Sequence, residues 1–200
     1  MWEVIFDLET KKFFDDTGTS DPADLGVSVL SLYQRELNDN FAEVSGKMYS
    51  FWEKDFDHMW KLFQNADRII GFNSLSFDVP ALRPYAPAGF AKLNHFDILD
   101  KIVEIQGRRT SLNSIAKETL GNTKTDHGSN AIKYWLAGDP ESLRKLQYYC
   151  EMDVDITKRI YDFGLKNRYL KYIDHWNNVR TVEVDFSYPS NSSSVQSSLF

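Results

Sequence analysis

The sequence predicts an α/β fold built around a sheet of mixed direction, and three observations support this. An apolar run of β-branched and aromatic residues at 2–6 indicates a buried strand, with a second strand at 25–33 and a weaker third at 40–45. Turn-forming residues fill the segment between the first two strands, which favours an antiparallel three-strand meander. Helices alternating with further strands follow, and this order is typical of an α/β sheet flanked by helices.

The later elements follow from helical periodicity and from residues that typically begin a helix. Apolar side chains recur at helical spacing within residues 53–66, and a central strand is expected next, at 68–72. Helices are then expected near 78–86, 97–106, 111–119, 129–137 and 140–169. Asp139 and Pro140 form a typical start for the last and longest of these. Residues 171–186 are expected to add one or two short strands at an edge of the sheet.

Composition limits the classes of function. A chain of 200 residues with 42% hydrophobic content can bury a core, and we expect one domain at 1–186 followed by a tail at 187–200. No stretch approaches the roughly 18 apolar residues of a membrane helix and the start lacks a basic leader, so we expect a cytoplasmic protein with no membrane partner. The single Cys150 agrees with a reducing compartment.

The net charge of -6 argues against a protein that holds nucleic acid by a general positive field. Two bound divalent cations would bring that charge to about -2, so a metal-dependent nucleic-acid enzyme is still compatible with the composition.

Two carboxylates lie at the end of the first predicted strand. Asp7 and Glu9 are two residues apart, so they project from the same face of the strand. Like charges on one face repel unless a cation lies between them, and paired carboxylates suit Mg²⁺ or Mn²⁺. The pair is therefore a candidate metal site, with an ordinary exposed acid pair as the alternative.

Two further acidic positions lie later in the chain. Asp78 opens a helix after the strand at 68–72, where an ordinary helix cap is the alternative role. Tyr149 and Asp153 are four residues apart on the long helix and therefore share a face, although a tyrosine there could also be a packed core residue. Asp153 lies near the apolar side of the helix, so its charge requires a partner. Asn73 could hydrogen-bond a terminal nucleotide or only order its loop.

In this order the motifs resemble those of the DEDD superfamily of 3′-5′ exonucleases, in its tyrosine subclass. The matching residues are Asp7 and Glu9 in the first motif, Asp78 in the second, and Tyr149 with Asp153 in the third. The stretch GFNSLSFDVPAL at 71–82 is similar to the second motif of family B polymerase exonuclease domains, and residues 111–161 to stand-alone predicted exonucleases. The resemblance covers about residues 1–175, without the loop after Glu9 or the tryptophan-rich segment at 52–63. It implies a ribonuclease H-like fold.

The resemblance also implies an activity: metal-dependent 3′-5′ exonuclease cleavage at single-stranded DNA ends, in repair or replication. Asp7, Glu9, Asp78 and Asp153 would hold two divalent ions, Mg²⁺ or Mn²⁺. Tyr149, whose ordinary pKa is about 10, stays protonated at neutral pH and is expected to orient the attacking water. An RNA-trimming exonuclease is an alternative, because nothing in the motifs discriminates against a 2′-hydroxyl. A catalytically silent nucleic-acid-binding module is another.

Basic residues near these motifs could contact phosphates. Lys11 with Lys12, Arg108 with Arg109, and Lys124 are the candidates, and solvated surface charge is the alternative for each.

The tail at 187–200 is rich in serine and carries no charge, so we expect a flexible tether. It contains Gln196, Leu199 and Phe200 in the pattern Q-x-x-L-F, which resembles the short peptide by which bacterial polymerases and repair proteins bind the sliding clamp. An incidental apolar segment is the alternative. Clamp binding would favour DNA over RNA as the substrate.

Overall fold

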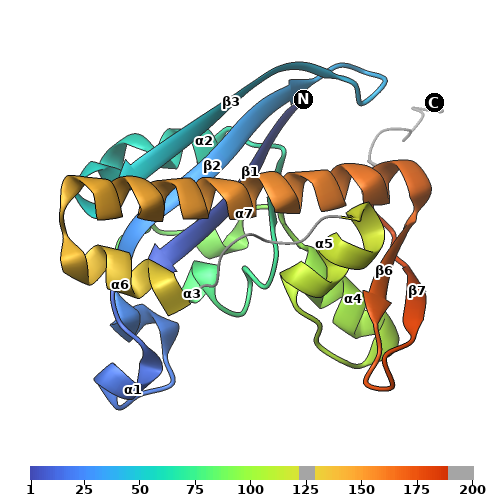
Figure 1. Cartoon of the computed structure of the whole chain (residues 1–200). Helices are drawn as coiled ribbons and strands as arrows, with labels where there is room; N and C mark the ends of the chain where they lie inside the picture. Colours follow the sequence, from blue (N-terminus) through green and yellow to red (C-terminus); the bar gives the residue numbers. More distant parts are fainter. Residues whose placement is uncertain (122–128, 189–200) are drawn as a thin grey trace, which may run out of the picture.

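The structure, a computed structural model, describes residues 1–121 and 129–188 (Figure 1). Lys124 and the tail candidates Gln196, Leu199 and Phe200 lie outside the described residues. The strands are β1 (Trp2–Thr10), β2 (Val27–Leu37), β3 (Glu43–Trp52), β4 (Arg68–Gly71), β5 (His95–Asp97), β6 (Tyr169–Ile173) and β7 (Val179–Glu183). The α-helices are α1 (Phe14–Thr17), α2 (Trp60–Gln64), α3 (Asp78–Ala81), α4 (Ile98–Gln106), α5 (Leu112–Leu120), α6 (Ser129–Ala137) and α7 (Pro140–Asn167), with short 3₁₀ helices at Pro22–Leu25, Glu53–His58 and Phe90–Lys92.

The main sheet has five strands in the order β3-β2-β1-β4-β5. β1 pairs antiparallel with β2, and β2 antiparallel with β3, which forms the expected meander. On its other side β1 pairs parallel with β4, and β4 parallel with β5. The predicted mixed α/β sheet is therefore confirmed, and β1 is its central strand.

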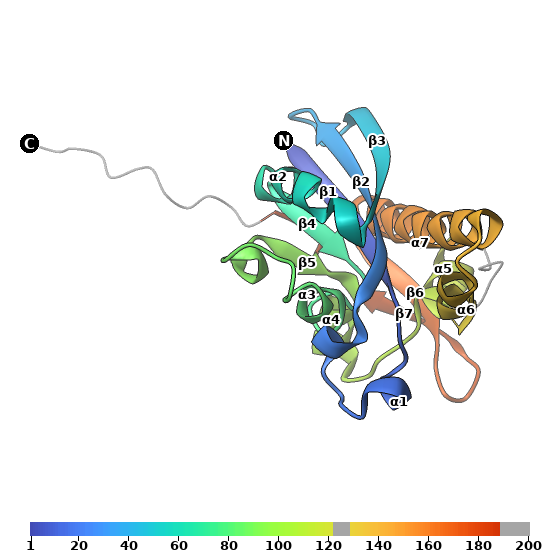
Figure 2. The same cartoon turned by 90° about the vertical axis from the view of Figure 1, so that its left-hand side faces the viewer.

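Side chains of β1 alternate between two cores. Val4, Phe6 and Leu8 pack in one apolar cluster with α2 and α3, whereas Ile5 packs in another with α4, α5 and α7. Figure 2 shows α7 and α2 on opposite faces of the sheet. Because residues two apart share a face, Asp7 lies on the side of Ile5, which is the side covered by α7.

Two local details differ from the prediction. β5 is missing from the prediction because a strand of three residues shows no alternation, and parallel pairing with β4 decides its conformation. Residues 171–186 do not extend the main sheet, since β6 and β7 form a separate two-stranded sheet. β6 is held instead by α5, where the hydroxyl of Thr119 accepts from Lys171 N at 2.9 Å and donates to Lys171 O at 3.0 Å.

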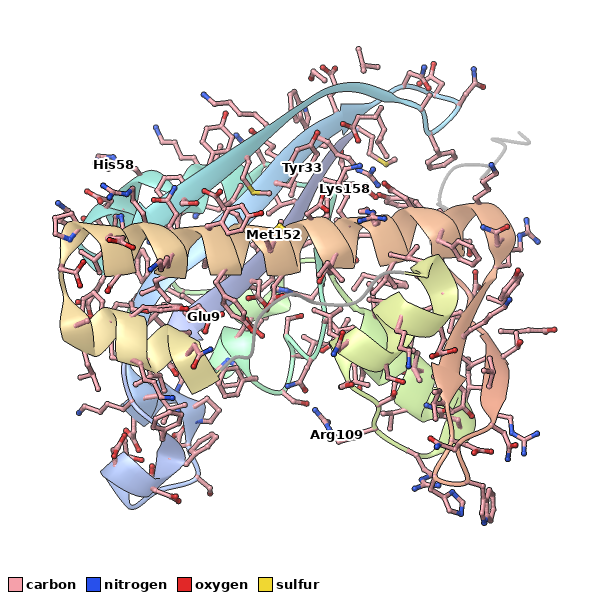
Figure 3. The ribbon with its side chains drawn as sticks, viewed as in Figure 1. Glu9, Tyr33, His58, Arg109, Met152 and Lys158 are labelled. Carbon is pink, nitrogen blue, oxygen red and sulfur yellow. The ribbon has the colours of Figure 1, made fainter. Side chains whose placement is uncertain are left out.

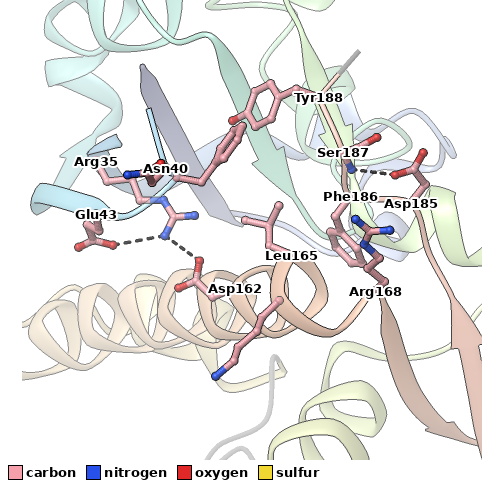
Figure 4. A pocket seen from close by; sticks show the side chains of 12 residues that line it. Arg35, Asn40, Glu43, Asp162, Leu165, Arg168, Asp185, Phe186, Ser187 and Tyr188 are labelled. Atoms are coloured by element: carbon pink, nitrogen blue, oxygen red, sulfur yellow. Dashed lines mark hydrogen bonds and ion pairs between the residues drawn. The ribbon is translucent and has the colours of Figure 1, made fainter. Parts of the chain in front are cut away.

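The end of the described chain is fastened to the N-terminal end of the sheet. The buried Arg68 guanidinium donates to Phe186 O at 2.8 Å and to Ser187 O at 2.7 Å, and the Tyr188 hydroxyl donates to Glu3. A cavity of about 730 Å³ lies beside this segment. Figure 4 shows Arg35 across it from Phe186.

The Arg35 guanidinium in this cavity is already neutralised. It contacts Glu3 at 2.7 Å, Asp162 at 2.6 Å and Glu43 at 3.3 Å. Glu3 faces Arg35 in the β1–β2 register, at the opposite end of β1 from Asp7 and Glu9. The large cavity is thus remote from the acidic motifs. Within the described ranges, no helix combines the length and the apolar character needed to cross a membrane.

Candidate active site

The end of β1 and the middle of α7 bring the first and third motifs together. Asp7 and Glu9 are half-buried on the β1 face that α7 covers, and the Cys150 thiol of α7 contacts Asp7 O at 3.4 Å. Carboxylate oxygens of Asp7, Glu9 and Asp153 all lie within 4.8 Å of one another. Three carboxylates this close are the donor set expected for a hard divalent cation. Figure 3 shows Glu9 below α7, to the left of its centre.

Tyr149 lies one helical turn before Asp153, on the same buried face of α7. Each of the two residues is 5% exposed. Burial is the main cause that raises the pKa of the Tyr149 phenol, and the charges of Asp153, Glu9 and Asp7 raise it further. The phenol is therefore a hydrogen-bonding group at neutral pH, and it cannot serve as a base.

Asp78 begins α3 and reaches the same cavity from the other side of β1. This cavity, of about 360 Å³, is lined by Asp7, Glu9, Asp78 and Asp153. Burial raises the pKa of Asp78 to about 7, with additional contributions from the charges of Asp97 and Asp153. Hydrogen bonds from the backbone of Asp78 and Leu8 oppose this rise. Four carboxylates line one cavity, and the raised pKa of Asp78 shows that its charge is disfavoured there. This arrangement fits a site in which bound cations neutralise the acids.

Asp97 holds the loop that leads to Asp78. It caps a helix, because its Oδ1 accepts from Leu99 N at 2.9 Å at the start of α4. The same carboxylate also accepts from Asn73 N at 2.8 Å and from Leu75 N at 2.9 Å. These contacts fix Asn73 with a left-handed φ of 66°. No local sequence pattern indicates the loop contacts, because they join segments more than 20 residues apart.

The predicted nucleic-acid contacts are placed unevenly. Asn73 lines the acidic cavity, and its side-chain oxygen accepts from Arg109, which lines the cavity as well. Lys11 pairs with Glu53, and its ammonium lies 5.3 Å from the centre of the Trp135 ring. Lys12 is exposed. Neither lysine belongs to the cavity wall, so their role in binding stays a prediction.

Comparison with known proteins identifies a family and similar solved structures. A family model described as the RNase H superfamily matches residues 4–163. The structure is similar to the family B DNA polymerase from the hyperthermophilic archaeon Pyrobaculum calidifontis, with a TM-score of 0.60 and 19% identity. The similarity covers 82% of this chain and 24% of the polymerase chain, so the match spans about a quarter of that protein. No curated protein sequence matches this chain.

Proposed function

This chain belongs to the ribonuclease H superfamily, and from that premise we propose that it is a metal-dependent 3′-5′ exonuclease of the tyrosine DEDD subclass. The observation that carries the proposal is the convergence of three sequence motifs on one cavity. Asp7 and Glu9 come from β1, Asp78 from the start of α3, and Asp153 from α7, where Tyr149 lies one turn before it. These elements meet only through the tertiary fold, so independent surface acids would have no reason to gather there.

The four carboxylates are the proposed ligands of two divalent cations, Mg²⁺ or Mn²⁺. When bound, such cations lower the pKa of a water nucleophile and neutralise charge that develops on the phosphate. Until they bind, Asp78 is held near its neutral form, because burial and the nearby acids disfavour its charge. Tyr149 donates a hydrogen bond that orients the attacking water, since its phenol keeps its proton.

Hydrolysis of labelled oligonucleotides tests this function directly. With Mg²⁺ or Mn²⁺, a 5′-labelled single strand is expected to shorten from its 3′ end one nucleotide at a time, and EDTA is expected to stop the reaction. Gel separation of the products gives both the rate and the polarity. A strand that stays intact with either metal would contradict the proposal and support a silent binding module instead.

Single-stranded DNA is the proposed substrate, with RNA as the alternative. The protein presents four carboxylates to the scissile region, and none of these contacts requires a particular sugar. Parallel reactions with DNA and RNA of one sequence separate the two. Faster cleavage of RNA would reverse the choice.

Binding to a bacterial sliding clamp is proposed from the pattern of Gln196, Leu199 and Phe200 alone, outside the described residues. Tethering would raise the local concentration of the enzyme at DNA, to the order of mM for a short flexible linker. A synthetic peptide of residues 187–200 is expected to bind a bacterial clamp, and the L199A/F200A peptide to lose binding. Calorimetric titration measures both. Equal or absent binding of the two peptides would reject the clamp and leave the nuclease proposal intact.

A further inference from the structure

A second cavity continues the acidic one and carries the opposite charge. Its volume is about 370 Å³, and Arg109 and Thr110 belong to the walls of both. We call it the hairpin groove, because it lies between the α4–α5 loop and the turn of β6 and β7. Arginines and aromatic rings characterise its wall, namely Arg108, Arg109, Arg180, Tyr172, His175 and Trp176.

The β6–β7 turn is rigidly built. Oδ1 of Asp174 accepts from Trp176 N and Asn178 N, both at 2.9 Å, and Oδ2 accepts from Arg180 Nε at 2.7 Å. Ser114 of α5 accepts from Ile173 N at 3.3 Å. Since the first residues of α5 also line the acidic cavity, this helix fixes the turn relative to the carboxylates. Figure 1 shows the β6–β7 turn beside α4.

Two guanidinium groups in the groove lack a carboxylate partner among the described residues. Arg108 Nη1 donates to the Nδ1 atom of His175 at 2.6 Å, and Arg109 donates to the side chain of Asn73. Arg180 differs, because Asp174 neutralises it. Both arginines are exposed, so in a chain with a net charge of -6 their guanidinium groups are available to a ligand that brings its own negative charge. Figure 3 shows Arg109 projecting away from the ribbon.

Trp176 supplies an apolar surface at the tip of the turn. It is 69% exposed, which is unusual for a side chain of this size. An exposed indole beside arginines matches a single-stranded nucleic acid, in which phosphates and bases alternate. An acidic protein would also pair with the arginines, but the groove joins the acidic cavity at Arg109 and Thr110, which favours the strand whose end lies at the carboxylates. A free phosphate would not explain the ring.

We propose that the hairpin groove binds the single-stranded nucleic acid next to the end held at the carboxylates. Arg108 and Arg109 contact backbone phosphates, and a base stacks on Trp176. This inference rests on the proposed function for its substrate class. It adds a second binding region, built by residues that follow the third motif or lie between the motifs, and it explains how an acidic chain holds a polyanion.

Binding measurements in EDTA test the groove without turnover. The full chain is titrated with a fluorescent single strand of about 12 nucleotides, and anisotropy is followed at several salt concentrations. Trp176→Ala is expected to weaken binding by roughly 5- to 150-fold. Trp176→Phe keeps a stacking ring and is expected to retain most of the affinity. Arg108→Gln is expected to reduce the steepness of log K against log[salt] by about 0.7.

Two variants serve as matched controls. Trp2→Ala removes a tryptophan at the far end of the sheet, and Arg144→Gln removes an arginine on the exposed surface of α7. A strand without bases should be less sensitive to Trp176→Ala than the normal strand, because stacking is what that variant removes. Wild-type affinity and salt dependence in both groove variants would overturn the inference. Since no hydrolysis is measured, failure of the groove is distinguished from failure of the nuclease proposal, which the oligonucleotide assay decides.

Discussion

Asp78→Asn is expected to lower the rate of nucleotide release by more than about 10²-fold, because the loss of a metal ligand should exceed the 10- to 100-fold usual for outer-shell changes. Asp78 is only 4% exposed, and asparagine has nearly the same shape, so the variant should leave no cavity. Single-turnover hydrolysis with saturating Mg²⁺ measures the effect. Asp7→Ala and Asp153→Ala are expected to behave in the same way. A wild-type rate in any of the three variants would remove that residue from the proposed ligand set.

Asp78→Asn should also make the metal-free protein more heat-stable, which distinguishes a ligand loss from misfolding. The native state raises the pKa of Asp78 from 3.8 to about 7, so it binds this proton more tightly than the unfolded state does. The proton's contribution to stability is complete below about pH 4 and is lost as the pH rises to about 7. The variant should therefore gain stability over the wild type in EDTA above about pH 7, and the gain should shrink as the pH falls towards 4.

Thermal unfolding followed by circular dichroism measures this gain, at roughly 2 to 4 °C for each kcal/mol recovered. Asp57→Asn, at an exposed position of the Glu53–His58 helix, is the matched control and should show no comparable gain. A variant less stable than the wild type at alkaline pH would show that Asp78 is structural rather than a strained ligand.

The acidic site could be predicted from the sequence because simple periodicities decide its geometry. Asp7 and Glu9 share a strand face, and Tyr149 and Asp153 share a helix face, whatever the rest of the chain does. Burial of Ile5 on the same side then directs the two acids towards the helix that packs there. The mixed sheet was predictable for a similar reason, since the meander and the later helices leave distinct patterns.

Long-range contacts were beyond such reasoning. The loop before Asp78 is held by Asp97, which looks like a simple helix cap in the sequence. Lys11 lies close to Glu9 in the sequence, yet its ammonium pairs with Glu53. The position of Trp176 in the hairpin groove depends on the packing of β6 against α5, which no local pattern shows. The side chains around the acidic cavity are therefore harder to predict than the acids.

Tyr149→Phe is expected to slow hydrolysis by roughly 10- to 10³-fold, the usual contribution of a group that handles or orients a proton. The ring stays in its buried position, so packing and the carboxylate cluster should persist and only the hydroxyl is lost. Because burial and the nearby acids raise the pKa of the phenol, the slowing should be the same at neutral and mildly alkaline pH.

The control for this variant is Tyr148→Phe, the same change on the preceding residue of α7, whose side chain is 62% exposed. Single-turnover rates at saturating metal give the comparison, and metal dependence of the rate shows whether the cations still bind. An orienting hydroxyl predicts a lower maximal rate with an unchanged metal midpoint, because it acts on the water and is not a ligand. A shifted midpoint would make Tyr149 a support for Asp153, and a wild-type rate would make it a packing residue.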